Sequence, residues 1–403
     1  MIQSPYNNTK DFNLPEIIFS TLKSVLPRDR DTISLHEPHF SGNEWKYVKN
    51  CLDSNFVSSV GKYVDKFEKM LVDYTGVKKA VAVVNGTAAL HISLNLSGVK
   101  KNDEVLLPTL TFIATANAVS YVNAIPHFVD SEEKTLGTDP QKLFDYLKKV
   151  GDIRKDACYN RNTGRRIRAL VAVHTFGHPV DLDSLQNLCE HYGIILIEDA
   201  AEALGSFYKK RHVGNWGKFS ILSFNGNKTI TTGGGGAILT HDKNLGKLAK
   251  HITTTAKKPH KWQFNHDRIG YNYRMPNINA ALGCAQLEQL STFLEQKRCL
   301  AKRYAEVFRR IKGVRFFPEP NFARSNYWLN VLLLDNSHRH ERDGVLETTN
   351  SRGIMTRPSW TLMHKLPMYE KCPRMDLSVA ERIEQTLINI PSSAMDCMTV
   401  NVV

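Results

Sequence analysis

The sequence lacks the features that mark several large classes of protein. None of its apolar runs approaches the ~18 residues that a membrane-spanning helix needs. Its first residues are polar and contain no apolar core of the kind found in a secretory signal. Internal repeats and low-complexity tracts are also missing. We therefore expect a globular protein with a cytoplasmic location and no membrane partner.

Cysteine and histidine patterns that would hold a metal are likewise missing. The seven cysteines are scattered, odd in number and never spaced as Cys-x-x-Cys, which indicates reduced thiols and neither a disulfide framework nor a zinc site. His174 and His178 are close in sequence, but a glycine and a predicted strand end lie between them, and no third ligand is nearby. We expect no bound metal.

Acidic residues are the scarcer charged type. The chain has 53 Lys and Arg against 40 Asp and Glu, a net charge of +13. Such an excess suits either a nucleic acid or small anions such as phosphates and nucleotide diphosphates. Much of it lies in residues 148–168 and 257–261, and neither segment carries a nucleic-acid-binding motif. We expect small anionic ligands and no nucleic-acid partner.

The chain does contain a regular alternation of strand and helix patterns. Apolar runs predict strands at 79–84, 104–108, 125–129, 168–173, 194–197, 219–223 and 237–240, with helical periodicity between several of them. This alternation predicts an α/β fold with a mostly parallel sheet and helices on both faces, in a large domain of residues 35–265. Helical patterns at 277–290 and 292–311 open a smaller α+β domain of residues 266–403. Residues 1–34 are interpreted as an N-terminal arm, and 151–167 as a basic insertion.

Lys228 is the residue that most directly indicates chemistry. It lies in the run 223–236 (SFNGNKTITTGGGG), and upstream Asp199 follows the apolar run 194–197. The carboxyl end of such a strand is where open α/β sheets bind ligands. A lysine that can form a Schiff base and a carboxylate that can pair with a pyridinium nitrogen are the two groups that pyridoxal phosphate requires. A helix cap is the alternative role for Asp199.

Two further segments could complete such a cofactor site. Gly86 and Thr87 join a buried strand to a helix, and the N–H groups of a helix N-terminus bind phosphate, although an ordinary capped helix start is the alternative. Phe112 could stack on a cofactor ring, although core packing is the usual fate of a phenylalanine. The glycines at 233–236 permit close backbone approach but do not have the spacing of a dinucleotide-binding loop.

Four segments, taken in order, resemble the DegT-type sugar aminotransferases. They are residues 85–90 (NGTAAL), 198–205 (EDAAEALG), 223–233 (SFNGNKTITTG) and 270–276 (GYNYRMP). The resemblance covers roughly residues 35–395. It implies the aspartate-aminotransferase fold (fold type I), a pyridoxal-phosphate enzyme with a mostly parallel sheet of the seven-stranded type and a smaller C-terminal domain.

The resemblance also implies residue roles. Lys228 would be the Schiff-base lysine and proton shuttle, Asp199 the partner of the pyridine nitrogen, and Glu202 a neighbour of the cofactor's phenolic oxygen. Other cofactor contacts would come from Gly86, Thr87 and Ser223 at the phosphate and Phe112 at the ring. Asn272 would reach the phosphate of the neighbouring subunit's cofactor, which implies a homodimer with shared sites. Weaker candidates for sugar, nucleotide or donor contacts are Tyr273, Arg274, Arg357 and His364.

The implied reaction moves the amino group of L-glutamate, through pyridoxamine 5'-phosphate, to C4 of a nucleotide-linked 4-keto-6-deoxy sugar. Residues 35–38 (LHEP) and 56–61 (FVSSVG) resemble the legionaminic-acid and bacillosamine branch, which implies UDP-2-acetamido-4-keto-2,6-dideoxyglucose. The GDP-perosamine synthase branch, with GDP-4-keto-6-deoxymannose, is the alternative. A related dehydratase replaces the lysine by histidine, and Lys228 argues against it. The intact site residues argue against a non-catalytic binding protein. Gly234 departs from the glutamate usual in the family.

Overall fold

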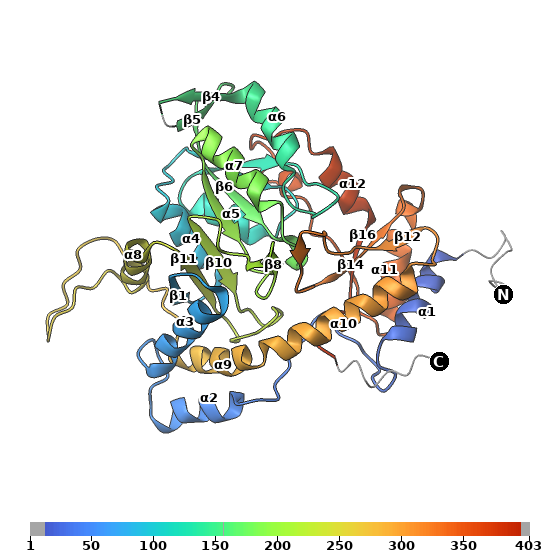
Figure 1. Ribbon diagram of the computed structural model, residues 1–403, viewed down its shortest axis with the longest axis horizontal. Coiled ribbons are helices and arrows are strands. Elements are labelled where there is room, and N and C mark those ends of the chain that lie inside the picture. The colour runs from blue at the N-terminus through green and yellow to red at the C-terminus, as the bar shows by residue number, and fades with distance from the viewer. Residues whose placement is uncertain (1–12, 156, 396–403) are drawn as a thin grey trace.

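A nine-stranded sheet forms the centre of the computed structural model, which describes residues 13–155 and 157–395 (Figure 1). Seven of its strands follow one path, in the order β1 (Lys79–Val83), β11 (Gly236–Thr240), β10 (Phe219–Ser223), β7 (Ile195–Asp199), β6 (Arg166–Val173), β2 (Glu104–Pro108) and β3 (Ile125–Val129). Strands β10, β7, β6, β2 and β3 are mutually parallel, and only β11 is antiparallel to its neighbours β10 and β1. The predicted α/β class with a mostly parallel sheet is confirmed.

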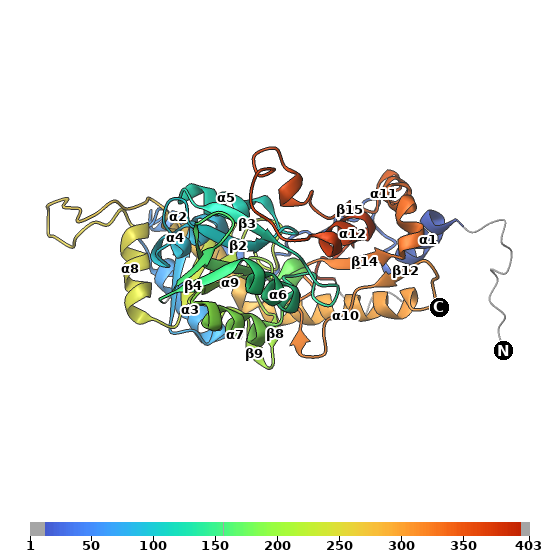
Figure 2. The same cartoon turned by 90° about the horizontal axis from the view of Figure 1, so that it is seen from above.

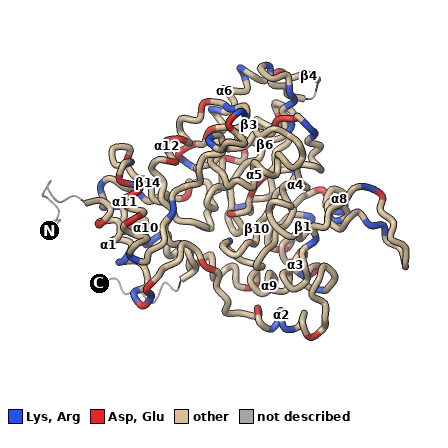
Figure 3. The backbone as a smooth tube through the Cα atoms, turned by 180° about the vertical axis from the view of Figure 1, so that it is seen from behind, with Lys and Arg blue, Asp and Glu red and all other residues tan. Residues whose placement is uncertain are grey.

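The remaining two strands come from the basic insertion. β4 (Gly151–Arg154) and β5 (Ala157–Asn160) form an antiparallel hairpin, and β5 pairs with the start of β6, with Cys158 opposite Ile167. Figure 3 shows Lys and Arg gathered on this hairpin and on the loop that follows α8 (Lys243–Thr253). The insertion therefore widens the sheet and carries part of the excess positive charge.

Helices cover both faces of the sheet because its strands present apolar side chains on both sides. In β1, Ala80 and Ala82 enter one hydrophobic cluster, whereas Val81 and Val83 enter another. The first cluster includes residues of α3 (Lys62–Thr75), α6 (Pro140–Val150), α7 (Leu182–Tyr192) and α9 (Asn277–Glu288), and the second those of α4 (Gly86–Leu96), α5 (Ile113–Tyr121) and α8. The period-two alternation of a strand separates the two sets.

The helix boundaries follow local signals. Helix α7 begins after Asp181, whose side chain accepts a hydrogen bond from the N–H of Ser184, and it ends at Gly193, which has a φ of 64°. Such a cap satisfies a backbone donor that the first turn leaves free, and glycine adopts the left-handed conformation with little strain. Asn85 caps α4 in the same way through the N–H of Ala88.

A four-stranded antiparallel sheet organises the C-terminal region. Its order is β12 (Val314–Phe316), β14 (Asn330–Leu334), β16 (Leu387–Ile390) and β15 (Arg357–Pro358). It lies near α10 (Leu290–Phe308), α11 (Arg342–Ser351) and α12 (Ser378–Thr386) (Figure 2). Helix α1 (Leu14–Val25) packs here too, because Ile18 and Leu22 are fully buried in one cluster with Leu300 and Tyr304. The domain boundaries near residues 34 and 265 remain a prediction.

Smaller elements link these two regions. A three-stranded sheet joins β8 (Phe207–Tyr208) and β9 (Arg211–His212) to β13 (Ala323–Arg324), and α2 (Glu44–Asp53) packs on α9. Short 3₁₀ helices occur at Thr175–Gly177, Asn336–Glu341 and Met363–Lys365.

Two expectations from composition can be compared with the described residues. Among residues 13–155 and 157–395, no helix combines the length and apolar character that crossing a membrane requires. Five cysteines, Cys51, Cys158, Cys189, Cys284 and Cys372, are free. Cys299 is disulfide-bonded, so the expectation of reduced thiols throughout is wrong at this residue.

Candidate active site

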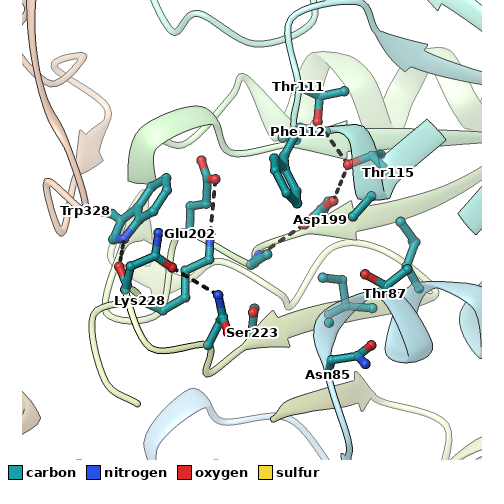
Figure 4. Close-up of a pocket in the computed structure, with 18 of the residues that line it drawn as sticks. Asn85, Thr87, Thr111, Phe112, Thr115, Asp199, Glu202, Ser223, Lys228 and Trp328 are labelled. Atoms are coloured by element: carbon teal, nitrogen blue, oxygen red, sulfur yellow. Dashed lines mark hydrogen bonds and ion pairs between the residues drawn. The ribbon is translucent and has the colours of Figure 1, made fainter. Parts of the chain in front are cut away.

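A cavity of about 240 Å³ lies where the parallel strands β7 and β10 end. The carboxyl ends of adjacent parallel strands face the same edge of a sheet, which makes this edge the usual ligand site of α/β folds. Seven of the residues singled out from the sequence line this cavity (Figure 4): Gly86, Thr87, Phe112, Asp199, Glu202, Ser223 and Lys228. The fold thus brings together segments that are far apart in the chain.

The first turn of α4 forms a seat for an anion. Asn85 Oδ1 accepts a 2.7 Å hydrogen bond from the N–H of Ala88, whereas the N–H groups at the start of a helix have no partner within the helix. Ser223, at the end of β10, lies beside this turn: a Cβ built on Gly86 would be 3.1 Å from the Ser223 Cβ. Backbone donors, a hydroxyl and the helix dipole converge there, and this combination suits a phosphate group.

The glycine run after Lys228 allows this close packing. A Cβ on Gly236 would lie 2.5 Å from the carbonyl carbon of Asn85, so a side chain there would displace the start of α4. A Cβ on Gly234 would meet nothing nearer than the carbonyl oxygen of Val84, at 4.0 Å. The position at which the family usually has a glutamate is therefore sterically open, whereas Gly236 is required by backbone contact.

Asp199 presents a buried carboxylate at the end of β7. Its Oδ2 accepts a 2.8 Å hydrogen bond from the Thr115 hydroxyl, and its Oδ1 accepts one of 3.2 Å from the N–H of Ala201. Burial raises the pKa of Asp199, and the bond from Thr115 is the main opposing influence. A cationic partner in the cavity would add to that opposition and stabilise the ionised form.

Lys228 points toward a second carboxylate in the same cavity. Its Nζ lies 3.2 Å from Glu202 Oε1, and the other oxygen of Glu202 accepts a 2.8 Å hydrogen bond from the N–H of Phe176. Burial raises the pKa of Glu202, and the neighbouring Lys228 ammonium opposes this effect. The pair places an amine and a proton-holding group within hydrogen-bond distance, as proton transfer requires.

Aromatic side chains form the walls of the cavity. Lys228 Nζ lies 3.8 Å from the ring centroid of Trp328, whose Nε1 donates a 2.6 Å hydrogen bond to the carbonyl of Asn227. Phe112 is 51% exposed although it lines the cavity, and its ring centroid is 6.2 Å from that of Trp360. An exposed phenylalanine over a cavity is available to a flat ligand. The stacking role of Phe112 stays a prediction that this position permits.

Several lining residues were not identified from the sequence. Among them are Thr111, Thr115, Trp328 and Trp360. Trp328 falls in a segment that reads only as a strand, and it meets Lys228 across 100 residues of chain. No local sequence pattern predicts this contact, because it depends on how the C-terminal region packs against the large sheet.

The other predicted site residues lie outside this cavity. Asn272 is exposed, whereas Tyr273 and Arg274 run beside β1, with Val84 donating to the carbonyl of Tyr273 at 2.9 Å. Arg357 is exposed and donates to Asn350. In His364, Nδ1 lies 2.8 Å from Thr109 Oγ1 and Nε2 lies 3.2 Å from Glu381 Oε1. The ligand contacts proposed for these residues remain predictions.

Side chains that could bind a metal do not cluster in the part of the chain that the structure describes. No group of three His, Cys, Asp or Glu has a suitable arrangement among those residues. His174 lies 3.2 Å from Glu198, and His178 packs edge-on against Phe317 and Tyr327. Each histidine therefore contacts other side chains of the protein core.

Comparison with known proteins identifies the family of the chain. Residues 38–400 match the model of the DegT/DnrJ/EryC1/StrS aminotransferase family. Over 338 residues the chain is 38% identical to EpsN of Bacillus subtilis, named as a pyridoxal phosphate-dependent aminotransferase, covering 84% of each chain. It is 38% identical to the GDP-perosamine synthase of Escherichia coli O157:H7, covering 89% of this chain and 93% of that protein.

A solved structure extends the similarity to three dimensions. Helicobacter pylori PseC, an aminotransferase involved in the biosynthesis of pseudoaminic acid, superposes with a TM-score of 0.81 at 25% identity. The superposition covers 89% of this chain and 93% of the other. It confirms the predicted fold type I architecture.

The glycine run provides a steric test of the site. Gly236→Ala is expected to destabilise the protein by about 1–3 kcal/mol, as overpacking does, and to weaken binding of pyridoxal phosphate because the start of α4 moves. Thermal unfolding and cofactor titration would measure both effects. Gly234→Ala is the matched control and should change neither. Equal behaviour of the two variants would contradict the assigned contact of Gly236 with Asn85.

Proposed function

Because this chain belongs to the DegT/DnrJ/EryC1/StrS aminotransferase family, we propose that it transfers an amino group to C4 of a nucleotide-linked 4-keto-6-deoxy sugar. The protein is an aminotransferase. The observation that carries the proposal is the meeting of Lys228, Asp199 and the anion seat of α4 in a single cavity. Each group suits a different part of one cofactor.

That cofactor is pyridoxal 5'-phosphate, which the name of the Bacillus relative also specifies. The residues present fit it: the first turn of α4 and Ser223 would hold the phosphate, and Asp199 the ring nitrogen. Phe112 would lie against the ring. When bound, the cofactor supplies an aldehyde that accepts an amino group and a ring that withdraws electrons from the adjacent carbon.

Lys228 supplies both the attachment point and the base. Its Nζ is the amine in the cavity that can take a proton from one carbon and return it to another. Glu202, at 3.2 Å, stabilises the ammonium form and thereby holds the proton between these transfers. The side chains of Lys228 and Glu202 are largely buried, which keeps bulk water away from the proton being moved. We propose L-glutamate as the amino donor.

The relatives favour a GDP-linked sugar as acceptor. Three of the similar proteins, from Escherichia coli, Vibrio cholerae and Caulobacter vibrioides, are named GDP-perosamine synthase and are 35–38% identical to this chain. We therefore place GDP-4-keto-6-deoxymannose first. UDP-2-acetamido-4-keto-2,6-dideoxyglucose, implied by the motifs at 35–38 and 56–61, is the second candidate.

A homodimer with shared sites is part of the proposal. The loop that follows α8 projects away from the body of the protein in both views (Figures 1 and 2). It carries Trp262, Phe264 and Ile269, which are 69%, 76% and 85% exposed. An apolar loop of this kind gains stability by burial against a second chain, and Asn272 at its base would then reach the partner's cofactor phosphate.

An absorbance experiment in two stages would test the reaction. Adding L-glutamate to the protein with bound pyridoxal phosphate is expected to bleach its visible absorbance. Adding GDP-4-keto-6-deoxymannose should then restore it, whereas the UDP-linked sugar should not. Recovery with the UDP sugar alone would establish the second candidate. Bleaching without recovery with either sugar would contradict both, and failure to bind the cofactor would contradict the assignment of Lys228.

Replacing Lys228 would test its double role. Lys228→Ala is expected to lower turnover at least ~10³-fold, because the variant loses the amine that moves the proton. Lys218→Ala, which removes an exposed lysine just before β10, is the control and should retain normal turnover. Steady-state rates would measure both, and turnover of Lys228→Ala near the control's would refute the assignment.

Complementation between two inactive chains would test the shared sites. Lys228→Ala and Asn272→Ala chains, each weak alone, are expected to regain roughly a quarter of normal activity when refolded together. Random pairing makes half of the dimers mixed, and each mixed dimer has one intact site. Full activity of Asn272→Ala alone, or no recovery on mixing, would contradict a site shared between subunits.

A further inference from the structure

Asp199 is held in place by a hydroxyl group from another element of the fold. Thr115 is the third residue of α5, whereas Asp199 is the last residue of β7, and the two are 84 residues apart. Their hydrogen bond, 2.8 Å from Thr115 Oγ1 to Asp199 Oδ2, therefore depends on how the helix packs on the sheet (Figure 4). Oδ1 is oriented separately by the N–H of Ala201.

The hydroxyl of Thr115 does not make the bond that helical threonines commonly make. A buried threonine in a helix can donate to the carbonyl four residues earlier. In this protein Thr75 donates to Leu71 in that way, at 2.7 Å, and Thr253 donates to Ala249, at 2.8 Å. Thr115 lines the cavity and donates to Asp199. As the third residue of α5, Thr115 has no helical carbonyl four residues before it, so its hydroxyl is free to donate to a partner in the site.

A second hydroxyl orients the first. Thr111 Oγ1 lies 2.9 Å from Thr115 Oγ1, and both residues are almost fully buried, at 1% and 2% exposure. A hydroxyl has one proton to donate. Since Thr115 gives its proton to the carboxylate, Thr111 must be the donor in the other bond. The result is a chain of two hydrogen bonds in which Thr111 donates to Thr115 and Thr115 donates to Asp199.

This chain of hydrogen bonds matters because a buried carboxylate without donors becomes neutral. Burial raises the pKa of Asp199, and the hydrogen bond from Thr115 is the first of the influences that lower it. A neutral Asp199 would pair poorly with a protonated ring nitrogen. The geometry thus directs a donor at the one carboxylate that has to stay ionised.

We propose that Thr115 is a positioning residue for Asp199, and that its hydroxyl, oriented by Thr111, holds the carboxylate ionised and directed at the cofactor's ring nitrogen. The inference rests on the proposed function, since it assumes that Asp199 serves pyridoxal phosphate. It assigns to Thr115 no contact with the reacting atoms. Its effect passes entirely through Asp199.

The test measures cofactor affinity, and not only activity, as a function of pH. Thr115→Val keeps the shape and removes the hydroxyl, whereas Thr115→Ser keeps the hydroxyl. Titrating each apoprotein with pyridoxal phosphate should show affinity ~10- to 100-fold weaker for the valine variant, the range for a hydrogen bond to a charged group. The serine variant should stay within about threefold. Thr75→Val, which removes another buried hydroxyl, outside the cavity, should match the original protein.

The pH dependence separates positioning from packing. A lost donor raises the pKa of Asp199, so affinity in Thr115→Val should fall at a higher pH on acidification than in the original protein. Thr111→Val should move that fall in the same direction by less, and it carries the test if Thr115→Val does not fold. An unmoved acidic fall in the folded Thr115→Val protein, or in Thr111→Val in its place, would overturn the inference. Failure of the unaltered protein to bind the cofactor would instead contradict the proposed function.

Discussion

A buried carboxylate at the end of one central strand is the constraint on which the site depends. Asp199 lies at the carboxyl end of β7, between β6 and β10, where it is only 7% exposed. Burying a charge is costly unless donors or an opposite charge surround it. The fold meets this requirement with the Thr115 hydroxyl and the Ala201 N–H, and it leaves room in the cavity for a cation. Helix α5 and the turn after β7 supply these two donors.

Backbone contact, more than side-chain chemistry, shapes the other end of the cavity. The antiparallel strand β11 passes so close to the start of α4 that Gly236 has no space for a side chain. This approach brings the end of β10, with Ser223, against the open N–H groups of the helix. An anion seat and a buried carboxylate are therefore held at fixed positions by one sheet, which is what a rigid, two-ended ligand needs.

The C-terminal region contributes to the site although the chemistry lies in the large sheet. Trp328 covers Lys228, and Asn326 donates hydrogen bonds to the carbonyls of Glu202 and Leu204 at 2.8 and 2.9 Å. These contacts couple the turn that carries Glu202 to the second sheet. In an aminotransferase family with shared cofactor chemistry, such surrounding residues are where differences in acceptor sugar can arise, because they can change without altering Lys228 or Asp199.

The sequence by itself determined the elements and the chemical groups. Strands predicted at 104–108, 125–129 and 219–223 occur at those residues, because apolar periodicity is a local property. The motifs around Lys228 and Asp199 likewise predicted the chemical groups of the site from the sequence. Only the tertiary structure decided that the basic insertion adds two strands, that Trp328 lies over Lys228, and that Thr115 donates to Asp199. Those contacts join residues remote in sequence, so they depend on how helices and sheets pack and not on any local pattern.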